Sequence, residues 1–250
     1  MSHIQVTREK RLAILTVKHA LDRATVREMR AAVDTLAQDD RLGVLVITGE
    51  ADAFVPGGEV EDLRGRTKRD ALSGQTAALF AVVEAFPCPV IAAINGAALG
   101  DGFELALACD LRIASDQARF GTAFANVGFS GDFGVTWGLT HAVGPAKAKE
   151  LFFLPDLVDA QEALRLGLVN RVYPHEGLWS EALAIAERIA GGPGVSYRYM
   201  KANINAAVTG DFRSLLEREA ETHIRCGETA DHAEGVAAFV EKREPRFQGR

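Results

Sequence analysis

Two carboxylates and a pair of glycines stand at residues 100–104, near the start of LGDGFELALACD (residues 99–110) and between two apolar stretches. Asp101 is flanked by Gly100 and Gly102, and Glu104 follows closely. Glycines followed by an apolar run predict a helix that begins at the glycines. The first N–H groups of a helix have no acceptor within it, and they attract negative charge. We therefore expect this segment to stabilise an anion, or an oxygen atom that becomes negative during a reaction.

A second glycine pair follows another predicted strand. Gly57 and Gly58 lie in ADAFVPGGEVEDL, residues 51–63, after the apolar run 42–48. Loops that follow neighbouring parallel strands converge on one ligand, so one N–H from each loop would form an oxyanion hole. Ordinary turns are the structural alternative. Phosphate binding is another, but Leu105 stands where a Gly-x-Gly-x-x-Gly fingerprint needs its last glycine.

A third acid, Asp132, lies among aromatic residues in VGFSGDFGVTW, residues 127–137. A carboxylate in an apolar pocket loses solvation, and its pKa rises toward the range that is useful for general acid–base catalysis. Aspartate in Gly-Asp-x-Gly is also a common turn residue, so a purely structural role stays open. The side chains expected to line such a pocket are Phe124, Phe129, Phe133 and Trp137.

The same segment nearly matches a nucleophile elbow, Gly-x-Ser-x-Gly, around Ser130. The last position is Asp132, and no strand is predicted directly before the serine. Candidate partners for the serine are His141, His175 and His223. A serine hydrolase stays open as an alternative, as does a non-catalytic protein that keeps the fold.

Alternating strands and helices are predicted to position these loops. The pattern indicates strands at 3–7, 11–17, 42–48, 90–94 and 111–114, a loop at 53–58, and helices at 25–38, 71–86 and 102–109. Later helices are predicted at 145–154, 160–166, 178–190, 195–208, 211–226 and 230–242. The alternation predicts an α/β fold with a mostly parallel sheet. We expect an α/β core over 1–190 and a helical C-terminal region over 191–250, after a glycine-rich break.

Composition excludes several classes of protein. The 250 residues are 48% hydrophobic and carry a net charge of −6, which gives a sizeable core and no basic surface for nucleic acid. No apolar stretch is long enough to span a membrane, and no apolar signal core is evident. Cys88, Cys109 and Cys226 match no zinc motif or disulfide framework. We expect reduced thiols, a cytoplasmic location and no metal.

Four segments carry a family resemblance. AFVPGGE, residues 53–59, resembles the Ala-Phe-x-Ala-Gly-Ala-Asp loop of the crotonase (enoyl-CoA hydratase/isomerase) superfamily. PVIAAINGAALGDGFELALACD, residues 89–110, is similar to its second signature, which usually ends Gly-Gly-Gly-x-Glu-Leu-Ala-x-x-Cys-Asp. GLVNRVYP, residues 167–174, and AFVEKREPRFQGR, residues 238–250, also fit. The resemblance therefore covers nearly the whole chain.

The resemblance implies a spiral of ββα units and a helical C-terminal region that forms a homotrimer or homohexamer. It implies an acyl-CoA thioester as substrate, with coenzyme A as part of the substrate and no separate cofactor. The thioester oxygen would lie between the N–H groups of Gly58 and Asp101. Asp101 replaces the usual glycine, and its side chain could lie near the thioester or point to solvent. The residues implied in binding CoA or the acyl group, in part across subunits, are Gly58, Glu59, Val60, Phe124, Phe239 and Lys242.

The resemblance also bears on the reaction. Hydratases of this family hold a water between two glutamates, and the first of these matches Glu104, which could otherwise serve only the helix dipole. The second stands in Phe-x-x-Pro-Glu, where this chain has Phe124 in place of the carboxylate. Asp132, a few residues later, resembles an aspartate of dienoyl-CoA and phenylacetyl-CoA-type isomerases. Double-bond isomerisation by Glu104 and Asp132 is thus predicted, with hydration through Glu104 as the alternative and thioester hydrolysis or decarboxylation as further options.

Overall fold

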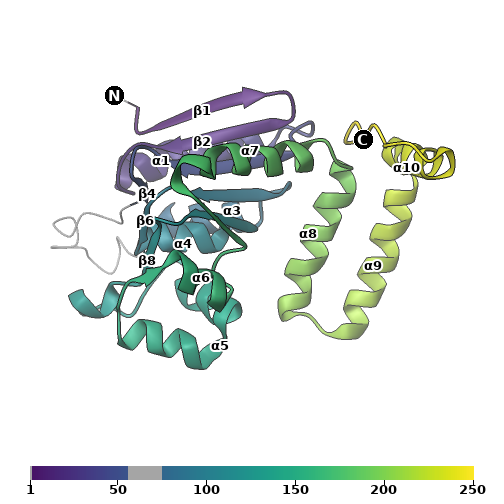
Figure 1. Ribbon diagram of the computed structural model, residues 1–250. Coiled ribbons are helices and arrows are strands. Elements are labelled where there is room, and N and C mark those ends of the chain that lie inside the picture. The colour runs from purple at the N-terminus through teal and green to yellow at the C-terminus, as the bar shows by residue number, and fades with distance from the viewer. Residues whose placement is uncertain (1, 56–74) are drawn as a thin grey trace.

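The computed structural model describes residues 2–55 and 75–250, and its largest sheet has six strands (Figure 1). The expected hairpin is present as an antiparallel pair, and the remaining pairs of this sheet are parallel, as predicted. In spatial order the strands are β1 (Ile4–Glu9), β2 (Leu12–Val17), β3 (Val44–Gly49), β5 (Val90–Ile94), β7 (Leu111–Ser115) and β10 (Arg171–Tyr173).

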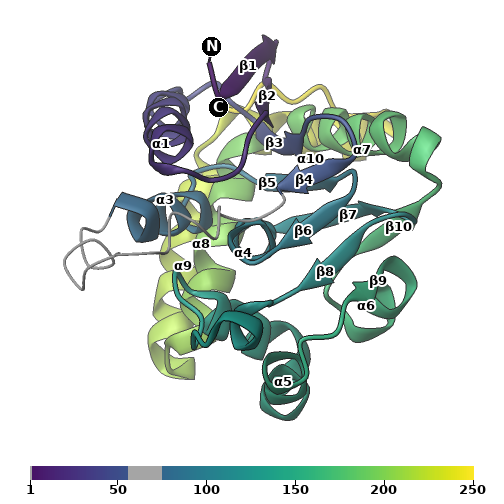
Figure 2. The same ribbon diagram turned by 90° about the vertical axis from the view of Figure 1, so that its left-hand side faces the viewer.

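A second sheet of very short strands lies beside the first (Figure 2). Its strands are β4 (Ala53–Val55), β6 (Ala97–Leu99), β8 (Arg119–Gly121) and β9 (Val158–Asp159). The chain runs from a strand of the first sheet to a strand of the second and then to a helix, which is the predicted ββα spiral. The prediction of a loop at 53–55 is wrong. These strands have two or three residues each, too few for an alternating pattern to be visible in the sequence.

Helices cover both faces of the main sheet, which explains its almost wholly apolar central strands. On one face, Leu45 and Ile47 of β3 join the larger core with α1 (Arg23–Ala37), α3 (Gln75–Glu84) and α4 (Asp101–Ala108). On the other face, Val44 and Val46 pack against α7 (His175–Ala190). Side chains of one strand thus alternate between two cores. Helix α4, with the acids near its N-terminus, packs in the larger core.

Two predictions about the second half of the core need correction. Helix α5 runs over Val135–Phe153 and is interrupted at Gly144, whose φ of 76° is outside the helical range. The predicted helix at 145–154 is therefore only its second part, while α6 (Ala160–Leu166) is as predicted. Strand β10 joins the main sheet beside β7, so the chain after residue 145 is not wholly helical.

Helices α8 (Gly194–Thr209), α9 (Phe212–Gly227) and α10 (Ala230–Glu241) agree with the predicted C-terminal helices to within a few residues. Figure 1 shows α8 and α9 side by side, away from both sheets. The tail returns to α10, where buried Asp231 accepts hydrogen bonds from the N–H groups of Gln248 and Gly249 at 2.6 and 2.7 Å. Within the described residues, no helix combines the length and apolar character that crossing a membrane requires.

Candidate functional site

The first turn of α4 is built by the glycines that precede and follow Asp101. Gly100 adopts φ 50° and ψ −121°, a conformation that favours glycine, and its carbonyl accepts the N–H groups of Phe103 and Glu104 at 2.9 and 3.0 Å. Asp101 is the first helical residue, so its N–H is one of those directed out of the helix N-terminus. The backbone geometry expected for one half of an oxyanion hole is present.

The end of β4 lies directly against this turn. A Cβ atom at Gly102 would overlap the carbonyl oxygen of Val55, so only glycine fits there. Val55, the last described residue before Gly58, therefore lies against the start of α4. Gly58, Glu59 and Val60 themselves lie outside the described residues, and their predicted contacts with the thioester and CoA stay predictions.

Three acids gather at the N-terminus of α4. Carboxylate oxygens of Asp101, Glu104 and Asp132 all lie within 4.8 Å of one another. Glu104 is buried at 2% exposure, Asp101 is half-buried, and Asp132 is exposed in the segment between the 3-10 helix η2 (Phe124–Val127) and α5. The structure thus brings together the two predicted proton carriers. It also turns the Asp101 side chain toward them, a position that the spacing of residues 101 and 104 on one helix face could have indicated.

Glu104 is a buried acid, and no cation of the described residues acts on it. Neither of its carboxylate oxygens has a well-formed hydrogen bond in the described part of the chain. The pKa of Glu104 is raised to about 10, chiefly by burial and in part by the nearby carboxylates of Asp132 and Asp101. At neutral pH Glu104 is therefore protonated and able to donate a proton. The expectation that burial would act on Asp132 is wrong, because the buried member of the pair is Glu104.

The predicted aromatic lining around Asp132 is only partly present. Phe133 has a positive φ of 43° beside Asp132, and its ring stacks on Phe80 of α3 at 5.6 Å. The stacking places Phe133, the next residue after Asp132, against α3. Phe124 is buried and stacks on Phe152 at 6.2 Å. Phe129 and Trp137 are exposed, and Trp137 lines a cavity elsewhere, so that part of the prediction is wrong.

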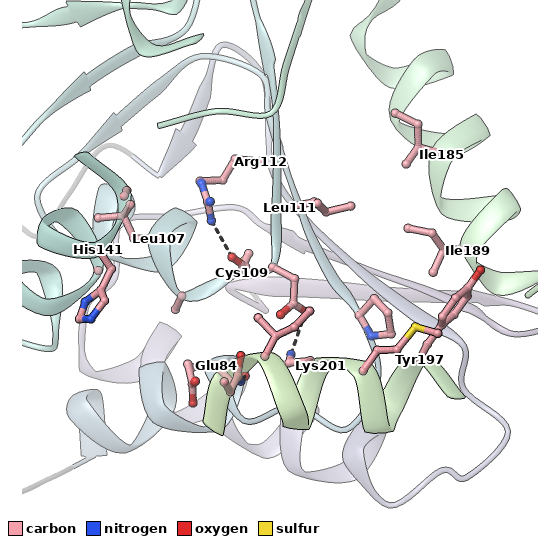
Figure 3. Close-up of a pocket in the computed structure, with 18 of the residues that line it drawn as sticks. Glu84, Leu107, Cys109, Leu111, Arg112, His141, Ile185, Ile189, Tyr197 and Lys201 are labelled. Atoms are coloured by element: carbon pink, nitrogen blue, oxygen red, sulfur yellow. Dashed lines mark hydrogen bonds and ion pairs between the residues drawn. The ribbon is translucent and has the colours of Figure 1, made fainter. Parts of the chain in front are cut away.

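That cavity, of about 700 Å³, lies at the opposite end of α4, between this helix, α7 and α8. Figure 3 shows Arg112, Tyr197 and Lys201 around it. Lys201 Nζ is 2.8 Å from Asp110 Oδ2, which also accepts the N–H of Val90 at 2.7 Å. Arg112 donates to the carbonyl groups of Leu168 and Cys109. The acid at this end, Asp110, thus has a cation beside it, in contrast to Glu104 among the described residues.

The described residues hold no serine–histidine pair at Ser130. The Ser130 hydroxyl lies 3.5 Å from the carbonyl oxygen of Gly131. His141 Nδ1 contacts the carbonyl oxygen of Trp137, and His175 Nδ1 lies 3.1 Å from the hydroxyl of Ser115. The geometry therefore gives no support to the serine hydrolase.

Phe239 and Lys242 lie at the end of α10, which Figure 1 shows on the opposite side of the chain from β4 and β6. Phe239 is 87% exposed, and Lys242 is exposed at the C-cap of α10. Within one chain the structure does not bring these two residues to the acids.

Carboxylates gathered in this way can also attract a cation. Exposed and half-buried acids often gather without an ion, so we assign no metal site.

Comparisons with known proteins agree across the whole chain. A family model described as enoyl-CoA hydratase/isomerase matches residues 11–250. The chain is 37% identical over 255 residues to a crotonyl-CoA hydratase of Syntrophomonas wolfei, covering 98% of this chain and 97% of that protein. It is 31% identical to a 2,3-dehydroadipyl-CoA hydratase of Escherichia coli, covering 100% of both chains. The crystal structure of an enoyl-CoA hydratase from Bacillus anthracis superposes with a TM-score of 0.94 at 31% identity, covering 99% of this chain and 100% of that one.

Proposed function

This chain belongs to the enoyl-CoA hydratase/isomerase family and is an enzyme of that family, and we propose that it moves a carbon–carbon double bond within an acyl-CoA thioester. The observation that carries this proposal is the pairing of a buried, protonated Glu104 with an exposed Asp132, whose carboxylate oxygens lie within 4.8 Å. A protonated acid and a second carboxylate are the two groups that a proton shift between carbons needs.

In the proposed reaction Asp132 removes a proton from a carbon of the acyl chain. The electron pair moves toward the thioester oxygen, where the N–H of Asp101 stabilises the negative charge. Glu104 then returns a proton to another carbon, and the product has the same atoms as the substrate. A proton passes from Asp132 back to Glu104 before the next turnover. The carboxylates supply both transfers, so the proposal calls for no cofactor apart from the CoA of the substrate.

Hydration is the second candidate, and the names of the similar proteins favour it. The relatives from Syntrophomonas wolfei and Escherichia coli are both called hydratases. The same two carboxylates could hold a water and protonate the enolate that its addition produces. Against hydration stands Phe124, which fills the place of the second glutamate and packs on Phe152.

A panel of 2-enoyl-CoA and 3-enoyl-CoA thioesters in deuterated water separates the two reactions. Isomerisation leaves the product mass unchanged except for deuterium, whereas hydration adds one water. We expect Asp132→Asn to lower kcat by about 10²–10⁴-fold, since it removes proton transfer and not binding. Asp156→Asn, which removes an exposed acid, is the matched control. Hydrated product as the main species, or a parent-like rate in Asp132→Asn, would overturn the isomerase proposal.

We also propose that the chain assembles as a homotrimer or homohexamer. Large apolar side chains are exposed along the C-terminal helices, and further ones border the cavity beside α8; they are Trp137, Met200, Ile204, Phe212, Leu216, Ile224, Val236, Phe239 and Val240. Contiguous exposed apolar surface of this kind is typical of a protein interface. In the assembly, Phe239 and Lys242 would reach the CoA of a neighbouring subunit.

Sedimentation analysis tests the assembly directly. A monomer at micromolar concentration would contradict it. Phe212→Asp places a charge on an exposed apolar residue of α9 and should weaken assembly, whereas Glu217→Gln on the same helix should not.

A cytoplasmic location is proposed from the three cysteines, all of which are free thiols. Fractionation of cells that produce the protein tests it.

A further inference from the structure

Asp101 stands where the family that the chain resembles usually has glycine, and its side chain is not needed to provide a backbone N–H. Its carboxylate nevertheless lies within 4.8 Å of the carboxylates of Glu104 and Asp132. On a helix, residues three positions apart lie on one face, so α4 itself holds Asp101 beside Glu104. A third acid at this place alters the charge around the proton donor.

The surroundings of Glu104 disfavour its ionised form. Its side chain is 2% exposed, and neither oxygen has a well-formed hydrogen bond in the described part of the chain. An ionised carboxylate in such a position would lose its hydration without compensation. The neutral acid is the form that this surrounding favours.

The two acids of α4 differ in how well each carries a negative charge. Asp101 is half-buried and is the first residue of the helix, where the N–H groups and the helix dipole stabilise an anion. Glu104 lies one turn further along and is shielded from solvent. Of these two acids, Asp101 therefore carries the negative charge more readily, and Glu104 keeps its proton.

We propose that Asp101 is a positioning residue whose carboxylate keeps Glu104 in its protonated, proton-donating form. The described charges that act on Glu104 are Asp132, from the segment before α5, and Asp101, from its own helix. Asp132 changes its own protonation in the proposed reaction, whereas Asp101 takes no part in the proposed proton transfers. The value of Asp101 for turnover rests on the proposed function, but its effect on the proton of Glu104 does not.

Carbon-13 NMR of protein labelled at the glutamate side-chain carboxyl carbon measures this proton directly. Glu104→Gln identifies the resonance, and a chelator in every sample excludes bound cations. We expect Glu104 to titrate at alkaline pH in the parent protein. Asp101→Asn removes one charge and keeps the backbone N–H, so it should increase the acid dissociation constant of Glu104 about tenfold. Asp101→Glu should restore most of the parent behaviour, and Asp156→Asn should change nothing.

A change of less than about twofold in folded Asp101→Asn would overturn the proposal, because one nearby charge would then have no effect on Glu104. Circular dichroism establishes folding, and Asp101→Ser serves as a second neutral variant. A shift in Asp156→Asn of the same size would also overturn it, since net charge alone would explain the result.

The pH dependence of kcat with an accepted thioester gives the second measurement. In Asp101→Asn, the alkaline limb of this profile should move to lower pH by the same number of pH units as the NMR titration of Glu104. If the titration moves while no acyl-CoA is converted, the proposed function fails and the role of Asp101 stands. If thioesters are converted but the titration does not move, the role of Asp101 fails and the proposed function stands.

Discussion

An acid stands near each end of helix α4, and the surroundings of buried Glu104 and half-buried Asp110 are opposite in kind. Past the C-terminus, Asp110 is paired with Lys201 at 2.8 Å and accepts a backbone N–H from Val90. At the N-terminus, Glu104 has two further acids nearby and no cation among the described residues. Burial raises the pKa of both, but Lys201 and the N–H of Val90 oppose the rise at Asp110. The paired acid supports the fold, and the unpaired one is available for chemistry.

The largest effect should come from Glu104→Gln. We expect kcat for an accepted thioester to fall by about 10²–10⁴-fold, because the amide cannot donate the proton. Thermal stability at alkaline pH should rise, since a neutral group replaces an acid that resists ionisation. A rate close to that of the parent, or a lower melting temperature at pH above about 8, would contradict the claim that Glu104, unlike Asp110, serves chemistry and not stability.

Lys201→Met should destabilise the fold by about 2–3 kcal/mol, because it leaves half-buried Asp110 without its cation. Lys201→Met combined with Asp110→Asn should recover part of that loss, since no uncompensated charge remains. Neither change should lower kcat much. Denaturant unfolding at one fixed protein concentration measures the free energies. An activity loss in folded Lys201→Met as large as that of Glu104→Gln would contradict the division of roles.

The pH dependence of stability should show a smaller effect with a definite sign. The pKa of Glu104 is about 10 in the folded protein and 4.5 in the reference state, so the folded chain holds an extra proton between these values. The free energy of unfolding should therefore fall by about 1–3 kcal/mol as the pH rises from about 5.5 to 8. Buried thiols, with a reference pKa of 9.0, contribute little in this range. Glu104→Gln should flatten the slope, and Lys201→Met should not.

Cys109 should give the smallest effect. It lies at the C-cap of α4, where burial raises its pKa to about 12. A thiol in that state is a weak nucleophile, so iodoacetamide at neutral pH should leave Cys109 unmodified in the folded protein. Mass spectrometry of the digested protein measures this. Rapid modification would show that the paired end of α4 opens to solvent.

The sequence predicted the parts of the site that depend on local pattern. Glycines before an apolar run predicted the start of α4. Phe124 in place of the second glutamate of the family indicated that Asp132 is the replacement acid. The approach of Asp132 to Glu104 follows from the resemblance, but local pattern alone does not contain it. It depends on the path of the chain through η2 and on the stacking of Phe133 on Phe80.

Other features could not be read from the chain because they arise from packing between distant segments. The exposure of Asp132, the burial of Glu104 and the separate cavity beside Trp137 depend on which helix covers which surface. Strand β4 was missed because three residues give no period. The Asp110–Lys201 pair joins the core to α8, and nothing in the sequence around either residue predicts its partner.

The close fit of Gly102 against Val55 affects how a mutational scan of this protein should be interpreted. A Cβ atom at Gly102 would overlap the Val55 carbonyl, and one at Gly96 would overlap that of Asp52. Both positions would therefore reject every other residue, and in a growth selection they would score like Glu104. A parallel scan for protein abundance would separate them, because glycine variants should disappear from the cell whereas Glu104 variants should accumulate.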